Sequence, residues 1–492
     1  MTIWQRRLLL GLLLLISPFT IPVGAAQTPF QSPTHQDYKV LRAATPFQDN
    51  NGSVPSSGVY SGPLFKLNHA WPTQAPSALT NAPWQAAIKN GNITPNNALD
   101  YANALKAAVA KNARELIMHY ETWDAAKAGW YNEPWLGSLR EAIRGTYGAS
   151  DFGPDQFPGT DLLTRFNTHV LTYYDARAAY TLRKFWGDSA TKPTLLTNDT
   201  QFTEGSLIIK AAIFTSEDAK DPLDWWKAMK GAQVWNMYLG VGPPGNSNKP
   251  QVWPGYVAQF DIIVKDSQSS PDTGWVFVTL VYDSRIDGDI WDKMVPLGAQ
   301  WGNDPQATAD NMTLHENWIN PSAPFYATRT LGWGGRLSGP NDGARNNIVI
   351  NGVVKKNFPD SACMSCHSTA QWNVSAHKMD SFLLPSIPTK VSPGYGLCDN
   401  YGKPNHKGSN ICSPEPGSTA WMKWFQDRRG TRPMDSGSIA TDFDLVFSFK
   451  SLKLWWLAEG PPNQEVPQLL RQPDSGLRFN LYTGAPLASP EP

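Results

Sequence analysis

Apolar and polar positions recur with two different periods in this chain, and the period changes near residue 200. Between residues 97 and 128 apolar side chains return every three or four positions, which predicts one or two amphipathic helices. Later stretches are apolar, β-branched or aromatic and are bounded by turn residues; they cover residues 205–215, 233–239, 256–264 and 274–282. Such stretches are typical of strands, so we expect a β-sheet or sandwich there.

Proline, serine, asparagine and glutamine are frequent from residue 27 to about residue 82, and the prolines interrupt any regular period. This composition predicts an extended, loop-rich lead-in. The chain has 492 residues, more than one hydrophobic core usually holds, so we expect several domains. The prediction is an α+β protein with a signal peptide at 1–26, the lead-in at 27–96, a mixed domain of helices and a β-sheet or sandwich at 97–350, a mainly α domain at 351–470 and a tail at 471–492.

The first residues have the pattern of a secretory signal peptide. Arg6 and Arg7 precede an apolar run at residues 8–16, and small residues follow at positions 23–26. Cleavage near Ala25 or Ala26 would release the mature chain into the periplasm. No later apolar run reaches about 18 uncharged residues, so we expect no transmembrane anchor after signal removal.

Charge and aromatic content limit the classes of partner. Lys plus Arg and Asp plus Glu both number 42, so there is no basic excess to neutralise phosphates, and nucleic acid is excluded as an expected partner. The 21 Trp residues indicate aromatic packing, and the 41 Pro residues indicate many loops.

One aromatic loop, residues 130–135, contains a single carboxylate, Glu133. In a functional interpretation, Glu133 faces a pocket walled by tryptophans that binds a sugar or an aromatic ligand. In a structural interpretation, Trp130 and Trp135 cap the helical layer, and the usual burial of tryptophan favours this interpretation.

The strongest chemical signal is the run Cys363-Met364-Ser365-Cys366-His367, which contains the Cys-x-x-Cys-His pattern of covalent haem attachment. Two thiols three positions apart can each add to one vinyl group of a haem. The adjacent imidazole can then bind the iron as the proximal ligand. The chain has only 4 Cys and 8 His, so a chance match is improbable, and we predict one covalently bound haem c.

Two other chemistries use the same residue types. In a zinc site, Cys363 and Cys366 would join Cys398 and Cys412 as four thiolate ligands. The thirteen residues between the second pair do not form the short knuckle usual for such sites. A thioredoxin-like redox pair needs a βαβ context that the sequence around Cys363 does not supply. Cys398 and Cys412 are therefore predicted to form a disulfide, as expected of two remaining cysteines in an exported protein.

The C-terminal quarter resembles a class I cytochrome c domain, and the chain as a whole resembles bacterial periplasmic single-haem cytochrome c family proteins. The resemblance rests on residues 363–367, on the turn at Pro433 and Met434, and on an aromatic closing helix at 442–457. It implies a cytochrome c-like haem domain at 351–470. In that domain Cys363 and Cys366 would carry the thioether bonds, His367 would be the proximal ligand and Met434 the distal ligand.

The distal position has rivals, because the loop between the motif and Met434 is longer than is typical of the family. The iron could instead keep an open position or take another ligand; the rivals are Met379, Met422, His377 and His406. The segment 368–377 is predicted to continue the helix of the motif.

These observations predict an electron-transfer protein with redox proteins as partners. The alternative is a haem-dependent oxidoreductase, peroxidase-like or substrate-oxidising, whose N-terminal domain binds a small molecule. In the peroxidase-like case, His377 is the nearest candidate for a distal acid–base group.

Overall fold

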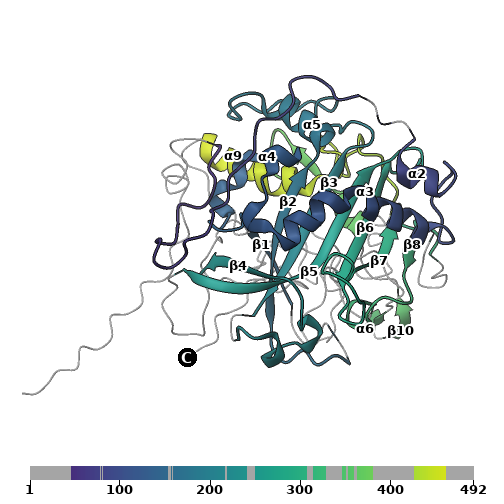
Figure 1. The fold of residues 1–492 in the computed structure, drawn as a ribbon. Coiled ribbons are helices and arrows are strands. Elements are labelled where there is room, and N and C mark those ends of the chain that lie inside the picture. Colours follow the sequence, from purple (N-terminus) through teal and green to yellow (C-terminus); the bar gives the residue numbers. More distant parts are fainter. Residues whose placement is uncertain are drawn as a thin grey trace, which may run out of the picture.

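The computed structural model describes twelve stretches of the chain: residues 46–77, 79, 81–152, 157, 159–216, 219–240, 250–306, 314–328, 346–350, 353–358, 363–379 and 426–460. Its centre is an antiparallel sheet, eight-stranded within the described residues (Figure 1). The strands are β1 (Tyr147–Phe152), β2 (Phe166–Tyr174), β3 (Leu207–Thr215), β4 (Val234–Leu239), β5 (Gln251–Lys265), β6 (Trp275–Tyr282), β7 (Met294–Gln300) and β8 (Asn317–Ile319). They are ordered β1-β2-β3-β5-β6-β7-β8, and β4 pairs with β5.

Helices and two small two-stranded sheets accompany the large sheet. The α-helices are α2 (Pro83–Ala87), α3 (Ala98–Met118), α4 (Ala125–Ala128), α5 (Ala176–Trp186), α6 (Phe325–Thr328), α7 (Cys363–His367) and α9 (Leu452–Glu459). The 3-10 helices are η1 (Tyr120–Thr122), η2 (Pro134–Leu139), η4 (Pro222–Asp224) and η5 (Lys227–Met229), and η7 (Val446–Ser451) is a π-helix. The remaining strands pair β9 (Asn346–Ile350) with β10 (Val353–Phe358) and β11 (Gln371–Asn373) with β12 (Ser438–Ala440).

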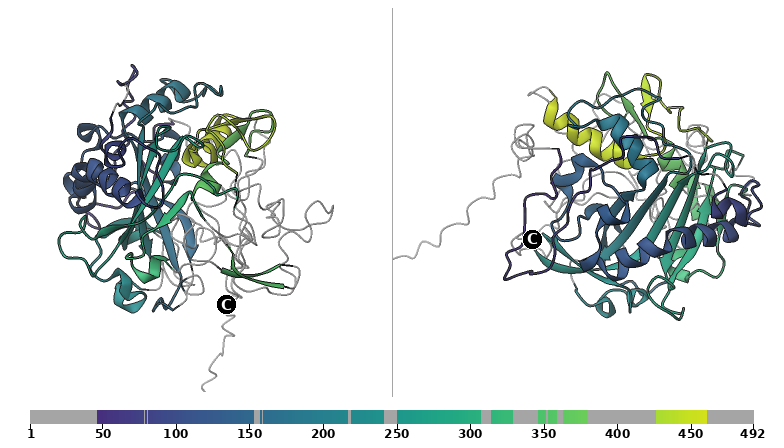
Figure 2. Two further views of the ribbon diagram at one scale, coloured as in Figure 1. Left: turned by 90° about the vertical axis from the view of Figure 1, so that its right-hand side faces the viewer. Right: turned by 45° about the horizontal axis from the view of Figure 1, so that its top comes forward.

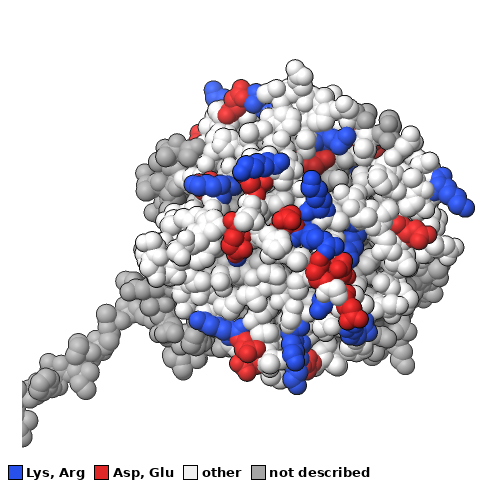
Figure 3. All heavy atoms as spheres, viewed as in Figure 1, with Lys and Arg blue, Asp and Glu red and all other residues white. Residues whose placement is uncertain are grey.

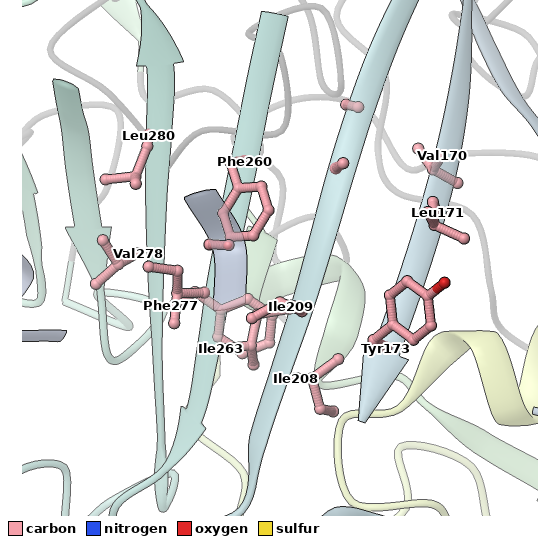
Figure 4. Close-up of a cluster of buried hydrophobic side chains, with 14 of the residues drawn as sticks. Val170, Leu171, Tyr173, Ile208, Ile209, Phe260, Ile263, Phe277, Val278 and Leu280 are labelled. Atoms are coloured by element: carbon pink, nitrogen blue, oxygen red, sulfur yellow. The ribbon is translucent and has the colours of Figure 1, made fainter. Parts of the chain in front are cut away.

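One face of the sheet is apolar and packs toward α3. The buried residues of α3 return every three or four positions, as the sequence predicted, and include Tyr101, Leu105 and Val109. Phe260 of β5 marks this face, because its ring lies 5.3 Å from that of Trp291, and Lys106 of α3 lies 5.4 Å over the same Trp291 ring. Figure 4 draws buried side chains from both faces of the sheet: Phe260 and Leu280 point toward α3, whereas their neighbours Ile263 and Phe277 lie on the other face.

The opposite face carries a row of polar residues. Strand register aligns Thr172 of β2 with Lys210 of β3, Lys210 with Asp261 of β5, and Asp261 with Thr279 of β6. Lys210 Nζ lies 2.6 Å from Asp261 Oδ2, and Thr279 Oγ1 donates to Asp261 Oδ1 at 2.9 Å. Thr172, Asp261 and Thr279 are all buried, so these polar side chains are not exposed to solvent.

The C-terminal residues lie on this polar face. Figure 2 shows α9 and α3 on opposite sides of the sheet. The ring of His367 in α7 lies 4.7 Å from that of Phe277 in β6, two positions from Thr279 and therefore on the same face. One continuous hydrophobic cluster includes residues from both sides of position 350, such as Val278 and Phe447. The predicted domain boundary at that position stays a prediction.

The mixture of helices with a large antiparallel sheet confirms the coarse α+β prediction. Within the described residues the strands form one large sheet rather than two stacked sheets. The predicted helix at 368–377 is wrong: α7 ends at His367, and Gln371–Asn373 form β11 instead. β11 finds its partner β12 more than 60 residues later, a long-range pairing that local helix propensity does not reveal.

Two findings concern the surface. In the ranges that the structure describes, no helix is both long and apolar enough to cross a membrane. On the face drawn in Figure 3, basic and acidic side chains are interspersed, as expected from the equal numbers of the two.

A buried ion pair ties the C-terminal segment to the sheet. Lys265 of β5 donates to both carboxylate oxygens of Asp442, at 2.7 and 2.9 Å. Trp275 Nε1 donates to Asp442 Oδ1 at 2.8 Å, and the Phe202 amide donates to Oδ2 at 2.8 Å. Gly430 lies so close that a β-carbon there would come within 1.6 Å of Oδ1. The Asp442 side chain is fully buried and satisfied by donors from three separate segments.

Asp442→Ala should lower the free energy of unfolding by about 3–5 kcal/mol, because it leaves the Lys265 ammonium buried without its partner. Urea denaturation followed by tryptophan fluorescence measures this change. Lys66→Ala, which breaks a pair whose lysine is 82% exposed, is the control and should cost less than about 1 kcal/mol. Equal losses in the two variants would contradict the central role given to Asp442.

Candidate functional site

The motif cysteines lie on the short helix α7. Cys363 and Cys366 are both half-buried thiols rather than a disulfide. A spacing of three residues places them on the same side of a helical turn. Burial raises the pKa of the Cys366 thiol to about 12, although the Lys210 charge acts in the opposite direction. The Cys366 sulfur is therefore protonated near neutral pH.

His367 is oriented by one backbone hydrogen bond. Its Nδ1 lies 2.7 Å from the carbonyl oxygen of Phe443. Because a carbonyl only accepts, Nδ1 carries the proton and Nε2 keeps its lone pair. Burial lowers the pKa of His367 to about 4, so the imidazole is neutral at physiological pH. A neutral imidazole whose other nitrogen is held by a backbone carbonyl is the usual arrangement of a metal-ligating histidine.

The Phe443 carbonyl is aimed by an unusual stretch of backbone. Asp442 and Phe443 have φ values of 46° and 68°, in the left-handed region that non-glycine residues rarely enter. Two such residues in succession are costly, and the buried contacts of the Asp442 carboxylate hold them in place. The ion pair with Lys265 thus also fixes the acceptor for His367.

Side chains of the sheet complete the surroundings of the motif. Gln300 Oε1 accepts a hydrogen bond from the Met364 amide at 2.7 Å. Its Nε2 is fully buried and has no hydrogen-bond partner among the described residues. Asn303 Nδ2 lies 3.5 Å from Ser368 Oγ, just beyond the motif. The orphaned amide of Gln300 is a donor available to a group that the described protein atoms do not provide.

The electrostatics beneath the motif depend on Lys210. Burial lowers its pKa, but the Asp261 carboxylate and the Cys363 sulfur outweigh that effect and raise the pKa above its ordinary value. Lys210 is therefore a cation whose charge is matched locally by Asp261. The pair places a dipole, not a net charge, under α7.

Met434 lies in the loop that leads into β12. It is half-buried, and its neighbour Asp435 is bonded twice to Gln371: Gln371 Nε2 donates to Asp435 Oδ2 at 2.5 Å, and the Asp435 amide donates to Gln371 Oε1 at 3.0 Å. Gln371 follows His367 by four residues, so the structure brings the Met434 loop beside the segment that leaves the motif. The assignment of Met434 as distal ligand stays a prediction.

The rival ligands fare differently. The His377 ring stacks on that of Trp456 in α9 at 3.4 Å and 12°. Met379 packs against the hydrophobic core. Met422 and His406 lie outside the described residues, as do Cys398 and Cys412, so the predicted disulfide stays untested. In the described part of the chain, no three His, Cys, Asp or Glu side chains gather as a metal-binding group.

Glu133 does not line an open pocket. The residue is 1% exposed, and Trp186 Nε1 donates to its Oε2 at 2.8 Å. Burial and the nearby Asp444 charge raise the pKa of Glu133 to about 8, and burial raises that of Asp444 to about 6. Trp130 and Trp135 are buried as well, which agrees with the structural interpretation of this loop.

Sequence reasoning found the motif but missed the residues that orient it. Phe277, Gln300 and Asp442 come from distant parts of the chain, and no spacing relates them to His367. The left-handed pair at 442–443 contains no glycine that would have signalled it.

Comparison with known proteins gave no relative: no family model, no curated protein and no solved structure matches this chain.

Glu133→Gln should make stability less dependent on pH. In the unfolded chain Glu133 ionises above its ordinary pKa of 4.5, whereas the folded protein keeps the proton up to about pH 8. This group's contribution is therefore fully present below pH 4.5 and is lost by up to about 1.4 kcal/mol per pH unit as the pH rises to 8. The melting temperatures of variant and wild type should agree at pH 5, and the variant should melt higher at pH 8. Parallel curves across this range would refute a buried, protonated Glu133.

Proposed function

We propose that this protein is a periplasmic c-type cytochrome that carries one covalently attached haem and transfers electrons. One observation supports this most directly. On a single helical turn, two thiols stand beside an imidazole whose Nδ1 is bonded to the Phe443 carbonyl, which leaves Nε2 with its lone pair. A zinc site of four thiolates and thiol–disulfide chemistry need no histidine prepared in this way.

The residues fit the chemistry of haem attachment. Each thiol, of Cys363 and of Cys366, would add across one vinyl group: the sulfur–carbon bond forms at one carbon, and the thiol hydrogen goes to the other. The addition has no net oxidation or reduction, so it needs no further reactant. The protonated state of Cys366 is compatible with it. When bound, the haem supplies one-electron oxidation and reduction at its iron.

The chain's own residues would hold and shield this group. His367 Nε2 would bind the iron, and the Phe443 carbonyl would keep the ring in one orientation and increase its basicity. Phe277 lies against the imidazole and excludes water from one side. The buried Nε2 of Gln300 is a hydrogen-bond donor within the same neighbourhood. Met434 is our proposed distal ligand.

Location and partners follow from the sequence. The signal-like residues 1–26 favour export to the periplasm, where haem is attached to c-type cytochromes. The equal numbers of acidic and basic residues disfavour nucleic acid, and the proposed partners are redox proteins. The elements before residue 350 would select those partners or bind a small molecule. The stacking of His377 on Trp456 gives no support to a distal acid–base role, so we place the haem oxidoreductase second.

Production of the full chain together with a cytochrome c maturation system tests the attachment. The wild type should retain one haem through denaturing electrophoresis, and its pyridine haemochrome spectrum should indicate two thioether bonds. Cys363→Ala should leave one thioether bond, and the double variant with Cys366→Ala should lose covalent haem. The control, Cys398→Ala with Cys412→Ala, should keep it. A colourless wild type that contains zinc bound by all four cysteines would overturn the proposed function.

Met434→Ala should turn a low-spin, six-coordinate iron into one that binds carbon monoxide rapidly after reduction. Met379→Ala is the matched control and should leave the spectrum unchanged, because Met379 packs in the core. Absorption spectra before and after carbon monoxide addition measure both. An unchanged Met434→Ala spectrum would reject the distal assignment, and rapid binding by the wild type would favour the oxidoreductase.

A further inference from the structure

Two lysines lie one turn apart where η7 continues into α9. The Nζ atoms of Lys450 and Lys453 lie 5.3 Å and 5.5 Å from the centroid of the Phe449 ring, so the two ammonium groups flank one aromatic side chain. Among the hydrogen bonds and ion pairs of the described residues, neither ammonium has an acidic partner. Two other half-buried lysines are paired with carboxylates: Lys210 with Asp261 and Lys265 with Asp442.

Two half-buried cations side by side are unfavourable without an anion. Burial lowers the pKa of Lys450 to about 8. Burial, together with the Lys450 charge, lowers the pKa of Lys453 to about 7. A bound anion would remove the mutual repulsion and offset the cost of burial. The geometry of the pair therefore fits an acidic group that the described residues do not include.

The pair lies on the motif's side of the sheet. Lys450 Nζ is 5.9 Å from the ring of Tyr147 in β1, and the Tyr147 hydroxyl lies 3.2 Å from Thr172 Oγ1 in β2. Thr172 is the register partner of Lys210 in β3, whose charge acts on both motif cysteines. Two strand spacings, about 10 Å, separate β1 from β3. The motif also contacts β6 through Phe277 and β7 through Gln300, so Lys450 lies on the same face of the sheet as the motif but several strands away from His367.

The chemistry of haem gives this displacement a meaning. Its two vinyl groups, which would bond to Cys363 and Cys366, lie on one side of the macrocycle, and its two propionate carboxylates lie on the other. Cations that serve the carboxylates are therefore expected across the macrocycle from α7. We propose that Lys450 and Lys453 form a binding site for carboxylate anions, and that the propionates of the attached haem occupy it. The identity of this occupant rests on the proposed function.

The test uses the full-length holoprotein with Lys450→Gln, Lys453→Gln and both together. Loss of a nearby positive charge favours the oxidised haem, so each variant should shift the reduction potential downward, and the double variant should shift it most. Protein-film voltammetry measures the shift. Lys192→Gln is the control, because Lys192 is an exposed lysine close to α9. Its neighbour Thr191 accepts a hydrogen bond from the Trp455 indole of α9 through its backbone carbonyl. It should leave the potential unchanged.

A second measurement distinguishes the source of the carboxylate. Succinate is titrated against the wild type and the double variant while thermal unfolding is followed. If the propionates fill the site, succinate changes neither melting temperature. If a dissolved organic acid is the natural occupant, succinate stabilises the wild type and not the double variant. That result would support the carboxylate site but reject the propionates as its occupant. Unchanged potentials together with no succinate effect would overturn the site.

Failure of the site and failure of the proposed function give different results. Covalent haem in the wild type with unaltered potentials in all lysine variants refutes the site alone. A colourless wild type refutes the proposed function and the propionates as occupants, and the succinate titration of that same protein then decides whether the lysines bind a carboxylate.

Discussion

The buried carboxylate of Asp442 is the interaction on which the rest of this structure depends. It neutralises Lys265, accepts from the Trp275 indole and holds a backbone turn in the left-handed region. That turn presents the Phe443 carbonyl to His367. A charge inside a protein is tolerated only when it is paired and fully hydrogen-bonded, so the contacts that stabilise the fold also fix the orientation of the imidazole.

The sheet has a different role on each face. Toward α3 it is an apolar layer that supplies the hydrophobic core. Toward α7 it presents buried polar groups, of which Lys210 and Asp261 form a closed ion pair. Buried polar groups are costly, and they are retained where they position something. Here they support the segment that contains the two cysteines and His367.

Buried titratable groups outside this ion pair have shifted pKa values. Glu133 and Asp444 are buried close enough to affect each other, and both hold their protons to higher pH than exposed carboxyls do. Near neutral pH Glu133 therefore keeps its proton, whereas Asp444 is ionised. Burial lowers the pKa values of Lys450 and Lys453 instead, and neither ammonium has an acidic partner among the described residues.

The sequence by itself determined the α+β class, the helix within 97–128, the strands after 200 and the Cys-x-x-Cys-His spacing, because periodicity and spacing are local properties. It did not determine the strand β11, whose partner lies more than 60 residues away. Nor did it reveal that Phe443 orients His367, or that Glu133 is buried instead of facing a pocket. Those facts depend on which distant segments meet on the sheet, and long-range packing decides that, since no local pattern encodes it.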